Sequence, residues 1–358
     1  MDTIIPTDII IVGAGPIGLE LAAALKRARL DYIHLEAQQI GYTISWWPRN
    51  TYFFSTTERI EIAGIPSQST TQQRLTGEEY LAYLRSVVEQ LDLKVNTYER
   101  VVEIQHLEGG FWVSSQAQTG PRHYFCRQLV LATGDMHASN KLGIPGEELP
   151  HVSHYFDDPH KYFRKRLLIV GGRNSAVEAA LRCWRAGSQV TISYRRAEFD
   201  PALVKSHILP DLLVQIEFGN IQFLPCTIPI KIEPGRVFLQ TAPGPEPSDD
   251  PLELPVDFVL FNTGFVADMS LFEMAGVVLH GEQRIPEYNP ETMETNVPGL
   301  YVAGTAAAGS QKRYTLFIEN CHVHVGKIAA ALSGMWPNKL GTIPSRRYEL
   351  PFEEYQAN

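Results

Sequence analysis

The sequence is poor in cysteine, and its cysteines are far apart. The sequence has 358 residues and four cysteines: Cys126, Cys183, Cys226 and Cys321. No two of them form a Cys-x-x-Cys pair or a spacing that zinc sites use. An internal redox dithiol and a zinc site are therefore excluded. The sequence favours four free thiols in a reducing compartment, which predicts a cytoplasmic protein with no metal.

Long apolar runs and an excess of basic residues are also missing. No window approaches the roughly 20 apolar residues of a membrane-spanning helix, and the N-terminus lacks the basic region of a signal peptide. The net charge of -9 and the pI near 5.7 argue against nucleic acid as a partner. With 44% apolar and 20% charged residues, the chain is predicted to be globular and to form two domains.

Glycine turns dominate what is present. The apolar run from Asp8 leads into a Gly-x-Gly-x-x-Gly motif, a helical stretch continues to Leu30, and a strand over residues 32–35 ends at an acidic residue. This order is the dinucleotide fingerprint in its required context, with backbone N–H groups at a helix start facing the phosphates and the acid facing the ribose hydroxyls. An FAD site is predicted from Gly13, Gly15, Pro16, Ile17, Gly18 and Glu36.

A second unit of the same kind begins at Arg166. Its strand leads into a glycine turn, then a helix over residues 177–186 and a strand over residues 190–194. Arg173 replaces the expected second glycine, and two arginines stand where the first unit has its acid. Guanidinium groups pair with a 2′-phosphate that an acid would repel. An NADPH site is predicted from Gly171, Gly172, Arg173, Asn174, Ser175, Ala176, Arg195 and Arg196.

Two buried strands end in Thr-Gly, which predicts that the chain passes between the domains at these two points. Thr133 and Gly134 are assigned to the FAD side, and Thr263 and Gly264 to the NADPH side. A later strand, residues 299–304, returns to the first domain. The predicted fold class is α/β, with two Rossmann-like (three-layer ββα) dinucleotide-binding domains, the NADPH domain being inserted in the FAD domain. The predicted ranges are 1–150 and 266–358 for the FAD-binding domain and 151–265 for the NADPH-binding domain.

Local patterns predict several further elements. Thr76 and Glu79 form a capping box that opens a helix to about Gln90. Alternating residues 94–115 predict a β-hairpin that turns at residues 108–110, and residues 242–251 predict an exposed loop. A last helix over residues 319–332, ended by Gly334, is expected to direct the positive end of its dipole at the flavin.

Taken together, these phrases resemble the low-molecular-weight thioredoxin reductase family over nearly the whole chain. Within it, residues 61–66, 171–176, 291–296 and 317–320 resemble the YpdA type, the bacillithiol disulfide reductases. The resemblance implies bound FAD, NADPH as the electron donor and a homodimer. It also implies flavin contacts from Gly304, Thr305 and Ile318.

The chain departs from that family at three positions. Residues 154–158 stand where thioredoxin reductases carry their Cys-x-x-Cys, so electron transfer to an internal disulfide is excluded. Ile17 stands where the YpdA type usually has a cysteine. Gly304-Thr305 replaces a Gly-Asp that contacts the flavin ribityl chain, although a hydroxyl can still form a hydrogen bond there.

Cys321 and Glu319, at the start of the last helix, are the candidate catalytic residues. A helix dipole would stabilise a thiolate at Cys321, whereas the alternative is a thiol packed against a neighbouring helix. His322 and His324 are expected to serve as surface or packing residues.

The leading hypothesis is an FAD-dependent NADPH oxidoreductase, thioredoxin reductase-like, that acts by hydride transfer via the flavin. Its acceptor would be a low-molecular-weight disulfide or another two-electron acceptor, either a small molecule or a small redox protein. One alternative is a two-Rossmann flavin monooxygenase, although the full signature of those enzymes is missing. The other is a non-catalytic FAD-binding redox sensor, against which the second fingerprint and its arginines speak.

Overall fold

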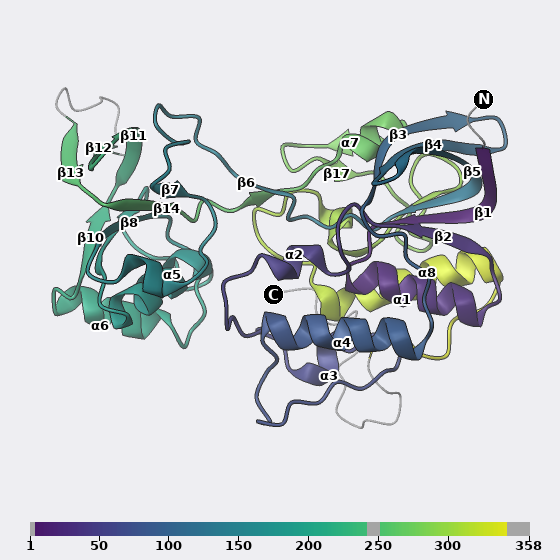
Figure 1. The fold of residues 1–358 in the computed structure, drawn as a ribbon, viewed down its shortest axis with the longest axis horizontal. Coiled ribbons are helices and arrows are strands. Elements are labelled where there is room, and N and C mark those ends of the chain that lie inside the picture. Colours follow the sequence, from purple (N-terminus) through teal and green to yellow (C-terminus); the bar gives the residue numbers. More distant parts are fainter. Residues whose placement is uncertain (1–3, 242–250, 342–358) are drawn as a thin grey trace. The chain divides into compact units, whose positions relative to one another are not determined.

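The computed structural model describes residues 4–241 and 251–341. Its contacts divide the chain into two compact units, shown in Figure 1. Unit 1 takes its described residues from 4–45, 50–138 and 265–341, and unit 2 takes them from 46–49, 139–241 and 251–264. The loop predicted at residues 242–251 lies outside the described residues except for its last position.

Unit 1 contains a sheet in the order β2-β1-β5-β4-β3, and β18 also pairs with β5. The strands β2, β1, β5 and β18 are parallel neighbours, whereas β5, β4 and β3 are antiparallel. The strands of this unit are β1 (Ile4–Val12), β2 (Tyr32–Leu35), β3 (Glu99–Leu107), β4 (Gly110–Ala117), β5 (Gly120–Leu131), β16 (Leu279–His280), β17 (Ile285–Pro286) and β18 (Leu300–Val302). The hairpin predicted across residues 108–110 is confirmed by β3 and β4.

Helix α1 lies against β1 and β2 of this sheet, and Figure 1 shows α1 and α8 side by side. The capping box at Thr76 is confirmed, because its hydroxyl accepts the N–H of Glu79 and the Glu79 carboxylate accepts the N–H of Thr76. The helices are α1 (Pro16–Arg27), α2 (Tyr42–Ser45), α3 (Thr57–Ile60), α4 (Gly77–Gln90), α7 (Ser270–Met274), α8 (Ile318–Ser333) and the 3-10 turn η2 (Gly304–Ala308).

Unit 2 contains a parallel sheet in the order β10-β9-β8-β14-β7 and an antiparallel sheet in the order β11-β12-β13. Its strands are β7 (Val152–Ser153), β8 (Arg166–Val170), β9 (Gln189–Tyr194), β10 (Ile221–Pro225), β11 (Thr227–Glu233), β12 (Arg236–Thr241), β13 (Leu252–Pro255) and β14 (Phe258–Phe261). Its helices are η1 (Pro159–Tyr162), α5 (Asn174–Arg185) and α6 (Leu209–Glu217).

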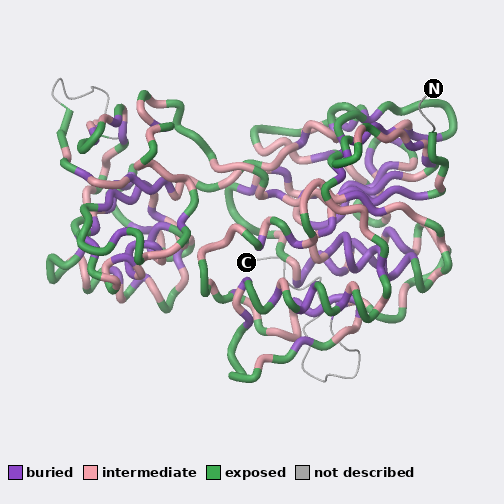
Figure 2. The backbone as a smooth tube through the Cα atoms, in the orientation of Figure 1, coloured by how far each residue is buried: buried purple, intermediate pink, exposed green. Residues whose placement is uncertain are grey.

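Alternation along β8 builds the three layers of unit 2. Leu167 and Ile169 pack in one core with residues of α5 and α6, whereas Leu168 and Val170 pack in a second core with residues of β11 and β12. Successive side chains of a strand point to opposite faces, so both faces of the parallel sheet are covered. Figure 2 shows the resulting concentration of buried backbone in the strands. The three-layer ββα prediction is confirmed.

The chain passes between the units through two short paired strands, β6 (Ala138–Ser139) and β15 (Phe265–Val266). The contacts divide the chain after Ala138, earlier than the boundary expected at residue 150. The intervening loop belongs to unit 2 because Ile144 and Leu149 pack against its second core. In addition, the Glu147 carboxylate accepts the N–H groups of residues 142–144 at 2.7 to 3.3 Å.

A fully buried acid–base pair joins α1 to α8. Glu20 Oε2 lies 2.5 Å from His322 Nδ1, and both side chains are 0% exposed. Glu20 Oε1 also accepts the N–H of Ala63 at 2.8 Å. Burial opposes a charge on His322, but the Glu20 carboxylate outweighs it and raises the pKa of His322. The expectation that His322 is a surface or packing residue is therefore refined to a buried ionic contact.

We expect Glu20→Ala to destabilise the protein by about 3–5 kcal/mol, because it leaves a buried imidazolium and a backbone N–H without their acceptor. Glu89→Gln, an exposed substitution on α4, is the control and should change stability by no more than about 0.5 kcal/mol. Denaturant unfolding measures both. A cost below about 1 kcal/mol for Glu20→Ala would show that the pair does not hold the two helices together.

Candidate functional site

Strand register brings the predicted FAD residues to one edge of the unit 1 sheet. Val12 of β1 is the partner of Leu35 of β2 and of Leu131 of β5, and Leu131 is also the partner of Val302 of β18. Since these strands are parallel, their carboxyl ends lie together. The loops that follow them carry the first glycine turn, Glu36, Thr133-Gly134 and Gly304-Thr305. Open α/β sheets bind ligands at this edge.

Two of the fingerprint glycines are required by the protein itself. Gly13 has a φ of 103°, and a Cβ there would lie 2.5 Å from the carbonyl oxygen of Ala132. A Cβ at Gly18 would clash with the carbonyl oxygen of Gly13. Gly15 differs, because its φ of -71° suits any residue and, apart from its chain neighbours, no atom of the described residues lies within 4 Å of its Cβ position. The space in front of Gly15 therefore fits a ligand.

The acid at the end of β2 contacts the glycine turn directly. Glu36 Oε2 accepts the N–H of Ala14 at 2.7 Å, and Oε1 accepts the N–H of Gln38 at 2.8 Å. Burial raises the pKa of Glu36, against the lowering effect of these N–H donors. A carboxylate has acceptor capacity beyond two hydrogen bonds, so Glu36 fits the ribose role predicted for it.

The loops after β5 and β18 complete this edge. A Cβ at Gly134 would lie 3.8 Å from Thr305 Oγ1, and a Cβ at Gly304 would lie 3.5 Å from Cβ of Ile17. Thr133 Oγ1 is a buried atom with no hydrogen-bond partner in the described part of the chain. An unsatisfied buried hydroxyl at this edge is expected where a polar ligand binds. Together with the space at Gly15, it shows that the edge fits FAD.

Residues at the start of α8 are buried. The Glu319 side chain, 9% exposed, accepts the Ser55 hydroxyl at 2.6 Å, and Ile318 is the first residue of the helix. Cys321 is 0% exposed. Its pKa is raised well above the usual range, first by burial and then by the nearby negative charges of Asp135 and Glu319. This environment favours the packed thiol over the thiolate.

The first turn of α5 carries the second fingerprint. Gly171 has a φ of 142°, and a Cβ at Gly172 would lie 2.5 Å from the Tyr194 ring. Arg173 is the extended residue before the helix, so α5 begins at Asn174, three residues before the predicted start. Asn174, Ser175 and Ala176 therefore form the helix start. Unpaired N–H groups at such a start bind phosphate.

Arg195 and Arg196 directly follow β9 and are both exposed. The Arg196 guanidinium lies 3.5 Å from the Asp200 carboxylate, an exposed pair that leaves most donors of the arginine available. At the end of β14, the Thr263 hydroxyl donates to the carbonyl of Asn140 at 2.6 Å, and Gly264 has a φ of 95°. These groups also lie at carboxyl ends of parallel strands, as the NADPH prediction requires.

Sequence reasoning missed two buried polar residues of the unit 1 edge. His34 Nε2 lies 2.9 Å from the carbonyl oxygen of Gly13, and burial lowers the pKa of His34 to about 4, so the ring is neutral and supports the glycine turn. Asp135 directly follows the Thr-Gly strand end and is 8% exposed. The alternating pattern of β2 identifies His34 only as a strand residue. Asp135, in contrast, could have been recognised in the sequence as an acid directly after Thr133-Gly134.

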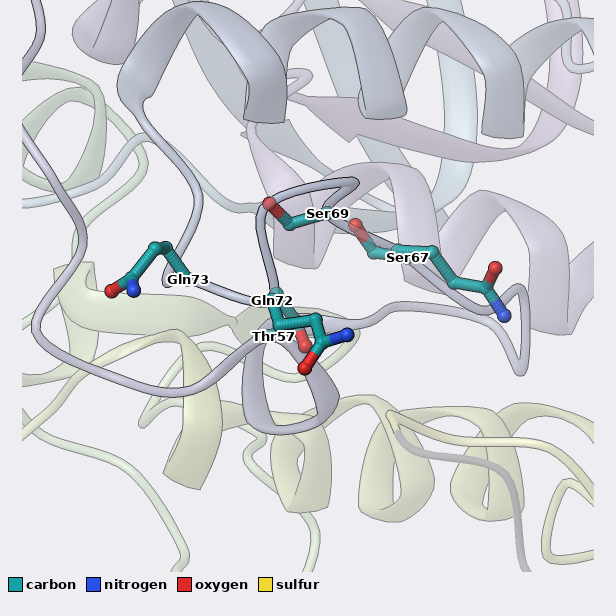
Figure 3. Close-up of a pocket in the computed structure, with 6 residues that line it drawn as sticks. Thr57, Ser67, Ser69, Gln72 and Gln73 are labelled. Atoms are coloured by element: carbon teal, nitrogen blue, oxygen red, sulfur yellow. The ribbon is translucent and has the colours of Figure 1, made fainter.

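A shallow polar hollow lies elsewhere on unit 1 (Figure 3). It has a volume of about 280 Å³, and its lining carries only hydroxyl and amide side chains: Thr57, Ser67, Gln68, Ser69, Gln72 and Gln73. These residues come from the start of α3 and from the loop before α4. None belongs to either fingerprint, so the hollow is not the predicted cofactor site.

Each unit thus presents a glycine turn at a helix start, and together they define a flavoprotein of the two-dinucleotide class. The pyridine nucleotide-disulphide oxidoreductase family matches residues 10–304. The chain is 33% identical over 324 residues to bacilliredoxin reductase Bdr of Bacillus subtilis, covering 90% of this chain and 97% of that protein. The chain therefore belongs to the pyridine nucleotide-disulphide oxidoreductase family.

Solved structures and other relatives agree. Bacillithiol disulfide reductase Bdr (YpdA) from Bacillus cereus superimposes with a TM-score of 0.85 at 32% identity, over 92% of this chain and 99% of that one. A ferredoxin–NADP reductase of Ignicoccus hospitalis is 28% identical, over 83% of this chain and 89% of that protein. A flavin-containing monooxygenase from Stenotrophomonas maltophilia, at 19% identity and a TM-score of 0.69, shares the fold alone.

Family membership establishes the general chemistry. The protein is a flavin-dependent oxidoreductase that uses FAD and NADPH. In the described part of the chain, no helix has both the length and the apolar character needed to cross a membrane. The same residues contain no His, Cys, Asp and Glu cluster suited to a metal ion.

We expect the double substitution Arg195→Gln/Arg196→Gln to raise the Michaelis constant for NADPH by about 10- to 100-fold. It removes charge-assisted hydrogen bonds to the 2′-phosphate, and NADH, which lacks that group, should be nearly unaffected. Steady-state kinetics with both nucleotides measures the ratio. Arg164→Gln, at an exposed arginine of the same unit, is the control. An equal loss with NADPH and NADH would contradict the assignment.

Proposed function

We propose that this protein reduces a low-molecular-weight disulfide with NADPH. The reaction balances as NADPH + H⁺ + RSSR → NADP⁺ + 2 RSH: two electrons leave NADPH as hydride, the S–S bond breaks, and solvent supplies the second proton. The observation that carries the proposal is the one-third identity to the Bdr proteins over nearly the whole of both chains, since those relatives are named as bacilliredoxin and bacillithiol disulfide reductases.

In this proposal, unit 1 holds FAD. The helix start at Gly15, Pro16, Ile17 and Gly18 binds the pyrophosphate through backbone N–H groups, and Gly13 allows the turn. Glu36 accepts the ribose hydroxyls. The further contacts come from Thr133, Gly134, Gly304, Thr305 and Ile318. FAD, when bound, supplies a two-electron carrier between NADPH and the acceptor.

Unit 2 would hold NADPH in the same manner. The start of α5, from Gly171 to Ala176, binds the pyrophosphate, and Arg195 and Arg196 bind the 2′-phosphate. Thr263 and Gly264 line the other side of the site. A separate site for each nucleotide lets both be bound at once, as direct electron transfer between them requires.

Three of the four cysteines are unsuited to supply a redox thiol to this reaction. Cys126, Cys183 and Cys321 are buried, and burial raises the pKa of Cys126 and of Cys183 to about 12. Attack on a disulfide requires a thiolate. We therefore propose that the acceptor disulfide receives electrons from the reduced cofactor without a covalent intermediate on Cys321.

A small redox protein is the second candidate acceptor. An acceptor of this kind needs no reactive protein thiol, and ferredoxin–NADP reductases are among the relatives. We also propose a homodimer, implied by the resemblance to thioredoxin reductases, and a cytoplasmic location, consistent with free cysteines. Light scattering of the purified chain tests the dimer.

The experiment is anaerobic reduction of the flavin by NADPH, followed by mixing with disulfides, quinones, ferredoxin or flavodoxin. We expect reoxidation by a low-molecular-weight disulfide, at a rate that Cys321→Ser changes by no more than about threefold because that thiol is buried and protonated. Cys183→Ser, at a buried cysteine of unit 2, is the matched control.

Two results would count against the proposal. If NADPH bleaches the flavin but no disulfide restores its colour, while ferredoxin or flavodoxin does, the second candidate replaces the first. If Cys321→Ser alone abolishes reoxidation by disulfides, the acceptor reacts through a protein thiol.

A further inference from the structure

Asp135 is a buried carboxyl group at the cofactor edge of unit 1. It follows Gly134 at the carboxyl end of β5 and is 8% exposed. Gln311 Nε2 donates to Asp135 Oδ2 at 2.8 Å. Burial raises the pKa of Asp135, against the lowering effects of Gln311 and Thr305. Acidic residues are seldom buried this deeply without a partner that uses their charge.

The loop around Gln311 does not depend on Asp135. Gln311 Oε1 accepts the N–H of Thr315 at 2.9 Å and that of Leu316 at 3.0 Å, and Gln311 Nε2 also donates to the carbonyl of Leu316 at 3.1 Å. These hydrogen bonds hold the Gln311 amide in place without a contribution from Asp135. Gln311 is therefore positioned to orient the Asp135 carboxylate, and Asp135 is not needed to hold the loop.

Asp135 can accept further hydrogen bonds. A carboxylate offers about four lone-pair sites, and in the described part of the chain one side chain, that of Gln311, donates a hydrogen bond to it. Two residues earlier, Thr133 Oγ1 is buried and has no hydrogen-bond partner in the described part of the chain. The same loop therefore offers an underused acceptor and an unsatisfied hydroxyl.

The chemistry of FAD narrows what these groups can bind. A carboxylate would be repelled by the pyrophosphate, and Glu36 suits the adenosine ribose. The remaining run of hydroxyl donors is the ribityl chain. We propose that Asp135, oriented by Gln311, accepts a hydrogen bond from a ribityl hydroxyl of FAD, and that the Thr133 hydroxyl bonds to the same chain.

The test compares FAD with ADP, which shares the adenosine and pyrophosphate but lacks the ribityl chain. Flavin-free full-length protein is titrated with FAD, and ADP binding is measured by competition. We expect Asp135→Ala to weaken FAD by about 10- to 100-fold, as loss of a hydrogen bond to a charged group implies, and to change ADP affinity by less than about twofold. Asp135→Asn, which keeps one acceptor oxygen, should lose less FAD affinity.

Glu99 supplies the matched control. It is a carboxylate of unit 1 that is 2% exposed, and its side chain accepts hydrogen bonds from Ser115 and Tyr124 between β3, β4 and β5. Glu99→Gln should lower the melting temperature and leave FAD affinity unchanged.

If the Asp135 variants weaken FAD binding and ADP binding equally, the proposal is overturned. Asp135 would then maintain the shape of the cofactor edge and would not contact the ribityl chain. FAD affinity within twofold of wild type would overturn it too. Should Asp135→Ala fail to fold, the ratio of FAD to ADP affinity in Asp135→Asn decides.

Discussion

The parallel register of neighbouring strands is the constraint on which the rest of this structure depends. Leu35 pairs with Val12, Val12 with Leu131, and Leu131 with Val302 across four parallel strands, so the loops after them converge. That convergence brings a helix start, an acid, an unsatisfied hydroxyl and a buried carboxyl group to one edge. Unit 2 repeats the arrangement around β8, β9 and β14, with arginines in place of the acid.

Burial explains why the chain relies on its cofactors for redox chemistry. A helix start alone would favour a thiolate at Cys321, yet this residue is fully buried beside Asp135 and Glu319, and its pKa rises. The same physics keeps His34 neutral under the glycine turn. Desolvation and like charge outweigh the helix dipole, whose effect is typically below about 1 kcal/mol.

Local patterns predicted well what local physics determines. The capping box at Thr76, the hairpin at residues 108–110 and the two strand–turn–helix units depend on residues within a few positions of each other. The first passage of the chain between the units was expected at residue 150, but the contacts place it after Ala138. The hydrogen bonds of Glu147 that keep residues 142–144 in unit 2 follow no periodic sequence pattern, so the sequence did not indicate them. The Glu20–His322 pair joins positions about 300 residues apart, and no single-sequence pattern indicates such a contact.

We propose that the glycine turn of unit 1 admits the pyrophosphate of FAD, and a substitution at Gly15 tests that role. Apart from its chain neighbours, no atom in residues 4–241 and 251–341 lies within 4 Å of a methyl group at this position, and the backbone there suits alanine. We expect Gly15→Ala to leave the melting temperature of the flavin-free protein unchanged and to lower FAD affinity at least tenfold, because the methyl group occupies the space that the pyrophosphate needs. Unchanged FAD affinity in a normally folded variant would show that the pyrophosphate does not lie against Gly15.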